Sequence, residues 1–215
     1  MHITFRIVDT SEVGRAHAWH SGFASANDAI FPRKESEFYD LAFERTLWCA
    51  ITDEDEIVGM SYAGVSSNET EVEIGGLMVA ARTRGKGIGE IMMRLPLIHF
   101  LATERPLRWP RPPAIVAHVV DGNQMPRRII AATGFRHHRH VTVDPKLLPG
   151  LRTGDDGLVH GDEFLLPMPD ALPALAIWVD GWTGILRDGT TAEIRLLEDE
   201  SVADWAVVLR SMTEN

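Results

Sequence analysis

Short segments in which hydrophobic and polar residues alternate predict β-strands, because successive side chains of a strand point to opposite faces. The first of these segments covers residues 3–8. Segments 47–52 and 56–65 flank an acidic turn and therefore predict a hairpin. Further strands are expected at 70–79, 114–120, 135–143 and 158–166.

Other segments repeat apolar residues every three or four positions, which predicts amphipathic helices. These segments are about 10–23, 34–45, 88–104 and 124–132. Thr10 or Ser11 could cap the first helix. Pro96 should kink the third helix, which has a broad apolar face. The four prolines in 105–113 predict a loop after it.

Residues 168–215 continue beyond this alternating pattern. Segments 176–181 and 184–186 resemble a hairpin, and 191–197 a further strand. Ser201-x-x-Asp204 resembles a capping box, which predicts a last helix. We therefore divide the chain into a domain at 1–167 and a C-terminal extension at 168–215. The extension is too small to fold alone and should pack on the core or at a dimer interface.

The run RTRGKGIG at 82–89 lies where a predicted strand gives way to a predicted helix. Its glycines leave backbone N–H groups accessible, and the helix N-terminus favours an anion. Its basic side chains add positive charge, so the run predicts a phosphate site. It is not a Walker A loop, because Lys86 is followed by Gly87, and not a Rossmann fingerprint, because Met92 occupies the third glycine position.

A second motif follows the predicted strand at 114–120. Asn123 suits a helix N-cap, Pro126 suits a first helical turn, and Gly134-Phe135 closes the segment eleven residues after Asn123. With the R-x-x-G-x-G pattern that begins at Arg82, this order and spacing resemble motifs A and B of the GCN5-related N-acetyltransferase (GNAT) superfamily. The resemblance covers roughly 1–167. It implies an α/β (α+β) fold whose mixed central sheet is splayed between strands four and five.

The resemblance also implies the cofactor and the residues that hold it. Acetyl-CoA would bind with its pyrophosphate on the glycine-rich run and its pantetheine arm along the edge of the strand at 70–79. Gly75-Gly76, just before that edge, predicts a bulge more than a packing adjustment. The expected cofactor-binding residues are Leu77, Met78, Val79, Arg84, Gly85, Lys86, Gly87, Ile88, Gly89 and Asn123.

The catalytic residues that the resemblance implies are Leu77, through its backbone N–H, and Glu73 as general base. A partly buried Glu73 should have a raised pKa. Glu73 could instead face solvent, and Glu71 competes for the role. Many members of the family have a tyrosine acid seven residues after the motif B asparagine, where this chain has Ile130. His118, Tyr62 and His138 are possible substitutes for that tyrosine.

Composition narrows the remaining possibilities. The 215 residues are 45% hydrophobic and 24% charged, and no apolar run is long enough for a transmembrane helix. A single cysteine, Cys49, excludes an intramolecular disulfide and indicates a reducing, cytoplasmic location. A net charge of −10 argues against a nucleic-acid partner. His138 and His140 share a strand face but lack a convincing third ligand, so we expect no metal.

Together these features predict an N-acetyltransferase that moves the acetyl group of acetyl-CoA to a primary amine of a small molecule or peptide. Transfer would be direct, in a ternary complex, because no side chain stands out as a nucleophile. A non-catalytic acyl-CoA binding or sensing module is the alternative, since the usual tyrosine is missing. An acetyltransferase toxin acting on charged tRNA is disfavoured by the −10 charge. A homodimer is possible.

Overall fold

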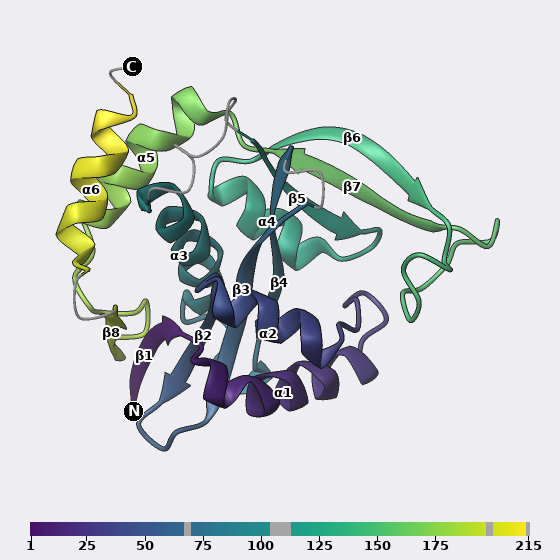
Figure 1. Ribbon diagram of the computed structural model, residues 1–215, viewed down its shortest axis with the longest axis horizontal. Coiled ribbons are helices and arrows are strands. Elements are labelled where there is room, and N and C mark those ends of the chain that lie inside the picture. The colour runs from purple at the N-terminus through teal and green to yellow at the C-terminus, as the bar shows by residue number, and fades with distance from the viewer. Residues whose placement is uncertain (67–69, 104–112, 197–199, 214–215) are drawn as a thin grey trace.

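The computed structural model describes residues 1–66, 70–103, 113–196 and 200–213 (Figure 1). The strands are β1 (His2–Ile7), β2 (Leu47–Thr52), β3 (Ile57–Val65), β4 (Glu71–Val79), β5 (Ala114–Val120), β6 (Arg136–Val143), β7 (Val159–Leu165) and β8 (Thr191–Arg195). The helices are α1 (Val13–Ser25), α2 (Glu35–Phe43), α3 (Ile88–Ala102), α4 (Gln124–Ala132), α5 (Met168–Asp180) and α6 (Val202–Ser211). Every strand and helix predicted before residue 168 is present in this order.

All these strands belong to one mixed sheet in the order β6-β7-β5-β4-β3-β2-β1-β8. The pairs β4 with β5 and β1 with β8 are parallel, and the other neighbours are antiparallel. The first β-hairpin joins β2 to β3, as the acidic turn predicts. The glycine-rich run connects β4 to α3 across the middle of the sheet.

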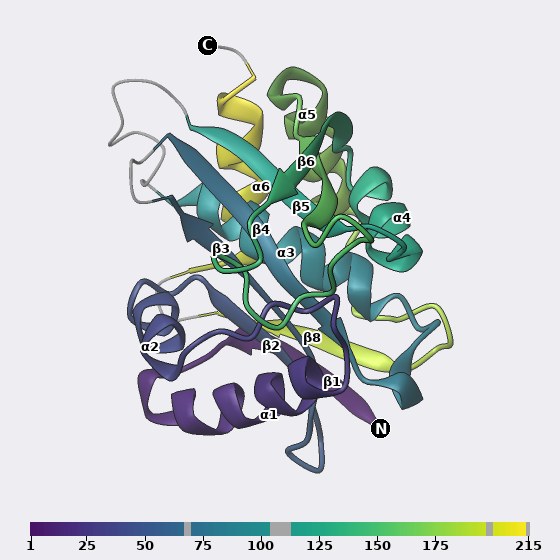
Figure 2. The ribbon, with the colours of Figure 1, turned by 90° about the vertical axis from the view of Figure 1, so that its right-hand side faces the viewer.

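Helices cover both faces of the sheet (Figures 1 and 2). Alternation along β2 shows why two layers form. Leu47, Cys49 and Ile51 pack with α1 and α2, whereas Trp48 and Ala50 pack with α3. The strand is buried on both sides, as a central strand between two helical layers must be.

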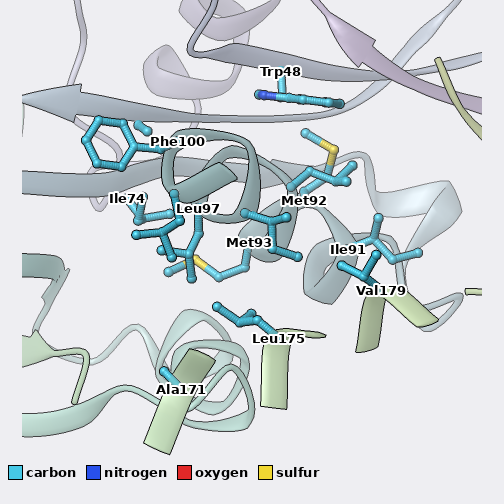
Figure 3. Packing of buried hydrophobic residues seen from close by; sticks show 14 of the residues in the cluster. Trp48, Ile74, Ile91, Met92, Met93, Leu97, Phe100, Ala171, Leu175 and Val179 are labelled. Atoms are coloured by element: carbon cyan, nitrogen blue, oxygen red, sulfur yellow. The ribbon is translucent and has the colours of Figure 1, made fainter. Parts of the chain in front are cut away.

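Helix α3 supplies much of the larger core (Figure 3). Met92, Met93 and Leu97 are buried on it, between the sheet and the C-terminal helices. Leu175 and Val179 of α5 close this layer on the far side. Pro96 lies inside α3, which nevertheless continues to Ala102.

The C-terminal extension corrects one prediction. Segment 176–181 was expected to form half of a hairpin, but 176–180 lies in α5 and Gly181 is the C-cap of that helix. The apolar residues Leu172, Leu175, Ala176 and Val179 have helical spacing, and α5 buries all four. The expected second half, 184–186, makes only a single bridge, between Ile185 and Thr191, among the described residues.

The last strand and helix occur as predicted, and they pack on the core. Strand β8 runs parallel to β1 at the edge of the sheet. Ser201 caps α6 by accepting the Asp204 N–H. The ring of Trp205 on α6 meets Trp48 and His99 edge-on at centroid distances of 6.1 and 5.8 Å. The division at residue 167 stays a prediction, because both regions share this hydrophobic cluster.

The cap at the start of the first helix differs from the prediction, and some predicted element ends cannot be compared with the structure. Neither Thr10 nor Ser11 caps the first helix, because both lie in a short 3-10 turn at Thr10–Glu12. Asp9 caps this turn by accepting the Ser11 N–H, and the N-cap of α1 is Glu12. Apart from Pro113, the proline-rich loop at 105–113 lies outside the described residues, as do Glu104 and Leu197 at two predicted element ends.

The helices in the described part of the chain are too short or too polar to cross a bilayer.

Candidate active site

A β-bulge in β4 shapes the middle of the candidate site. Met60 pairs with Met78, but Tyr62 pairs with Gly75, so Gly76 and Leu77 lie within a shift of register between β3 and β4. Gly76 has a φ of +61°, and a Cβ there would collide with the Tyr62 ring. The bulge predicted from the glycine pair is therefore confirmed, and the aromatic ring explains why both residues are glycine.

The parallel pairing of β4 with β5 is short. Its registered pairs cover Glu71 to Glu73, whereas β5 pairs with β7 along Val116–Val120. A cavity of about 430 Å³ lies beside the unpaired ends. Its lining includes His20 of α1 and Met93 of α3, which lie on opposite faces of the sheet. This arrangement favours the predicted splay between the fourth and fifth strands, which stays a prediction.

A second cavity, of about 350 Å³, lies at the N-terminus of α3. Gly87 is the N-cap of α3 with a φ of +91°, and Gly85 has a φ of +81°. Both positions thus require a conformation that glycine adopts without strain. A Cβ at Gly89 would lie 2.9 Å from the end of the Ile129 side chain, so the glycine allows α3 and α4 to pack closely there.

The two cavities bring most of the predicted cofactor residues together. Leu77, Met78 and Asn123 line both cavities, which are therefore neighbours. The second cavity is also lined by Val79, Arg84, Gly85, Gly87, Ile88 and Gly89. Lys86 is the exception, because its Nζ lies 2.6 Å from Asp188 Oδ2 and does not line the cavity.

Asn123 lies at the N-cap of α4, as predicted, but makes no side-chain capping hydrogen bond with the described residues. An N-cap side chain normally accepts a hydrogen bond from the first helical turn. This side chain is therefore available for a ligand in either of the two cavities.

Glu73 lies at the centre of a polar network on the wall of the larger cavity. Its Oε1 is 3.1 Å from His118 Nδ1, and the other nitrogen of His118 is 3.3 Å from Glu163 Oε2. Its Oε2 lies 3.4 Å from Arg33 Nη2 and from the Tyr62 hydroxyl. The Glu73 side chain is one-third exposed, at 33%. It lines the larger cavity.

The charges of this network are tightly coupled. Burial alone would raise the pKa of Glu73, but hydrogen bonding and charge from His118, together with Arg33 and Tyr62, hold that pKa below its ordinary value. The expectation of a raised Glu73 pKa is therefore wrong. The hydrogen bond with Glu73 instead raises the pKa of His118, against the opposing effect of burial. The pair is an anionic carboxylate beside a strengthened imidazole base.

The competing residues are placed differently. Glu71 lies at the start of β4 and is not among the residues that line either cavity. Ile130 lines the larger cavity and is buried, so it brings no acid to it. Tyr62 lines the same cavity, and burial raises its pKa. His138 lies 4.0 Å from Glu163 and outside both cavity linings.

The sequence did not indicate the structural roles of three residues of the site. His118 was only one of three possible acids, and nothing in its spacing indicated the contact with Glu73. Arg33 precedes α2 and reaches Tyr62. Arg187 comes from the C-terminal extension. These contacts join segments far apart in the sequence, and no motif marks them.

Arg187 links the extension to the glycine-rich run. Its backbone N–H donates to the Lys86 carbonyl at 3.2 Å, and its guanidinium lies 2.6 Å from Glu90. The Arg187 side chain also lines the second cavity and crosses over Gly87, where a Cβ would lie 3.4 Å from it. Arg187 and the neighbouring Asp188 thus attach the extension to the glycine-rich run and to the first turn of α3.

A cluster outside both cavity linings contains possible metal ligands. Asp121, His140 and Asp162 each offer an atom within 4.8 Å of the others. Arg127 donates to Asp121 at 2.9 Å and also pairs with Asp162. The Arg127 guanidinium contacts both carboxylates, so we interpret this cluster as an ion-pair network.

Comparison with known proteins gives one family and many structures of the same fold. A model of the acetyltransferase (GNAT) family matches residues 15–104. The chain is similar to Arabidopsis thaliana NAA60 in complex with a bisubstrate analogue, with a TM-score of 0.55 and 18% identity over 76% of this chain and 96% of that one. It is similar to yncA, a putative acetyltransferase from Salmonella typhimurium with its cofactor acetyl-CoA, with a TM-score of 0.55 and 15% identity over 76% and 92%.

The ribosomal-protein-S18-alanine N-acetyltransferase from Escherichia coli is also similar, with a TM-score of 0.52 and 17% identity over 77% of this chain and 93% of that one. At these identities the likeness shows the fold alone. No curated protein is significantly similar to the chain in sequence.

Proposed function

We propose that the chain is an N-acetyltransferase of the acetyltransferase (GNAT) family, whose model matches residues 15–104. It moves the acetyl group of acetyl-CoA to a primary amine of a small molecule or peptide, directly within a ternary complex. One observation carries this proposal. A cavity at the glycine-rich run and a cavity at Glu73 and His118 share Leu77, Met78 and Asn123, so donor and acceptor sites would meet there.

The smaller cavity has the chemistry that acetyl-CoA requires. Backbone N–H groups of the run and the N-terminus of α3 favour the pyrophosphate. Arg84 and Arg187 line the cavity and add positive charge. Leu77, Met78 and Val79 offer a strand edge along which the pantetheine amides can pair. Asn123 contacts the same arm from the opposite side.

The bulge gives Leu77 its role. Gly76 and Leu77 lie within the register shift, with no registered partner on β3 among the described residues. The Leu77 N–H would donate a hydrogen bond to the thioester carbonyl oxygen. This bond strengthens as negative charge develops on that oxygen during attack. The Leu77 side chain plays no part in this step.

Glu73 and His118 together prepare the amine. His118 takes one proton from the incoming ammonium group through Nε2, which first releases Glu163, and Glu73 on Nδ1 stabilises the imidazolium that results. The neutral amine nitrogen then forms a bond to the carbonyl carbon, the carbon–sulfur bond breaks, and the nitrogen releases its second proton to solvent to give the amide. Coenzyme A leaves as a thiolate that solvent protonates, so the missing tyrosine at Ile130 is not required. Proton transfer of this kind contributes typically about 10²–10⁴-fold to rate.

The acyl-CoA binding or sensing alternative shares the donor cavity but not the chemistry. Ile130 in the usual tyrosine position is the observation that favours it. The two functions differ in turnover and not in cofactor affinity. The cytoplasmic location and a homodimer stay predictions from the sequence.

A thiol-release assay with acetyl-CoA and a panel of primary amines tests the proposal. The native chain should release coenzyme A only when an amine is present. Glu73→Gln should reduce turnover by at least about tenfold and leave acetyl-CoA affinity unchanged. Binding of acetyl-CoA without amine-dependent release in the native chain would instead identify the binding module.

A further inference from the structure

Outside the network at Glu73, most of the wall of the larger cavity is apolar, with His20, Asn123 and His160 as its other polar side chains among the described residues. Ile30 and Phe31 come from the segment between α1 and α2, Val143 from β6, and Leu148 from the segment before β7. These residues belong to elements far apart in the sequence, so the apolar lining is a property of the assembled cavity. A substrate group placed there would be removed from water on several sides.

The cavity provides little negative charge that could bind a second cationic group of a substrate. Among the described residues that line it, Glu73 is the acidic one, and it is already in contact with Arg33 and His118. His20 also lines the cavity, and burial lowers its pKa to about 4, so its imidazole is neutral at neutral pH. A polyamine would therefore bury ammonium groups here without partners, which is costly.

Two segments that line the cavity are joined to each other. The Arg152 N–H donates to the Asp28 carbonyl at 2.8 Å, which ties the segment before β7 to the segment after α1. A Cβ at Gly150 would lie 2.9 Å from Pro32, so the two segments also pack closely there. These contacts between the two segments therefore hold the apolar wall in place.

We propose that the acceptor is a primary amine attached through a short linker to an apolar group of about the size of a phenyl ring. The inference rests on the proposed function and names its substrate class. The amino group would reach His118 and Glu73, and the apolar group would contact Phe31, Val143 and Leu148. A cavity of about 430 Å³ lies in the range of small-ligand sites. Polyamines and lysine side chains of peptides would be poor acceptors.

The test compares kcat/KM for 2-phenylethylamine, hexylamine, ethylamine, spermidine and a lysine-containing peptide at one saturating concentration of acetyl-CoA. We expect 2-phenylethylamine to exceed spermidine and the peptide by at least about tenfold, and hexylamine to exceed ethylamine by a similar factor. A higher kcat/KM for spermidine or for the peptide would overturn this inference but not the proposed function. Thiol release with none of the amines would defeat the proposed function, and this inference with it.

Variants connect the preference to the wall. Val143→Asp and Leu148→Asp should each lower kcat/KM for 2-phenylethylamine about tenfold, mainly through KM, while acetyl-CoA affinity is kept. Ile177→Asp is the matched control, because Ile177 is 71% exposed on α5 and does not line the cavity. Equal losses of kcat/KM in all three variants would contradict the assignment. An unchanged kcat/KM in both Val143→Asp and Leu148→Asp would contradict it too. Two wall variants guard against a folding defect in one.

Discussion

Charge coupling between single side chains determines what this site can do. Glu73 is a weak base, since His118, Arg33 and Tyr62 hold its pKa low, but it makes His118 a stronger one. The sequence marked Glu73 by its place in a strand motif. It did not mark His118, because the partnership joins neighbouring strands across the sheet and leaves no spacing signal.

The pH dependence follows from the raised pKa of His118. His118 must be neutral to accept a proton, so kcat/KM should rise with pH through a limb whose midpoint lies above the ordinary imidazole value of 6.5. His118→Asn should remove this limb and lower the rate at pH 8 by about 10²-fold. A midpoint at or below 6.5, or an unchanged limb in His118→Asn, would contradict the assignment.

Glu73 and His118 should each stabilise the fold, but over opposite ends of the pH range. The lowered pKa of Glu73 stabilises the fold above its unfolded pKa, and this contribution is lost as pH falls through the folded value. The raised pKa of His118 stabilises the fold below its unfolded pKa, and this contribution is lost as pH rises through the folded value.

Gly76 can be tested at the same scale. Gly76→Ala forces a Cβ against the Tyr62 ring at a φ of +61°. We expect a loss of about 1–3 kcal/mol in the free energy of unfolding and a lower kcat, because Leu77 would be displaced. Gly22→Ala in α1 is the control, since a Cβ there meets nothing within 4 Å. It should be neutral or stabilise by up to about 1 kcal/mol. Urea denaturation distinguishes the two, and equal effects would count against the bulge.

At the level of elements, hydrophobic periodicity was sufficient up to residue 167. It failed at α5, where Pro169 and Pro173 interrupt the pattern and the run at 176–179 also fits a strand. Pro169 falls in the first helical turn, where proline is tolerated, and the face at Leu172, Leu175 and Val179 is buried against α3. Tertiary packing thus overrode the local signal.

The connection between α5 and β8 carries a prediction of its own. Arg187→Ala should weaken acetyl-CoA binding about three- to tenfold, because the side chain is 62% exposed and an exposed cation contributes modestly. Arg195→Ala removes an equally exposed arginine, at 63%, outside both cavity linings. Titration calorimetry should show a loss only for Arg187→Ala, and a smaller loss at high salt. The same affinity for both variants would rule out the proposed contact.

For the whole molecule, the extension and the core form one hydrophobic cluster. Trp205 is 4% exposed and packs on Trp48, so Trp205→Ala should cost about 3–5 kcal/mol of the free energy of unfolding. Urea unfolding should stay a single transition. Val207→Ala, at a residue 62% exposed on the same helix, should change stability by at most about 0.5 kcal/mol. Two separate transitions in the native chain would show that the extension folds independently.

In the proposed function, the neighbouring cavities bring a thioester and an amine together for direct transfer. Mass spectrometry of the products from acetyl-CoA and 2-phenylethylamine tests it most directly. We predict the acetamide and coenzyme A thiol in equal amounts from the native chain, and much less of both from Glu73→Gln. Acetyl-CoA that binds the native chain but yields no acetylated amine from any member of the panel would contradict it.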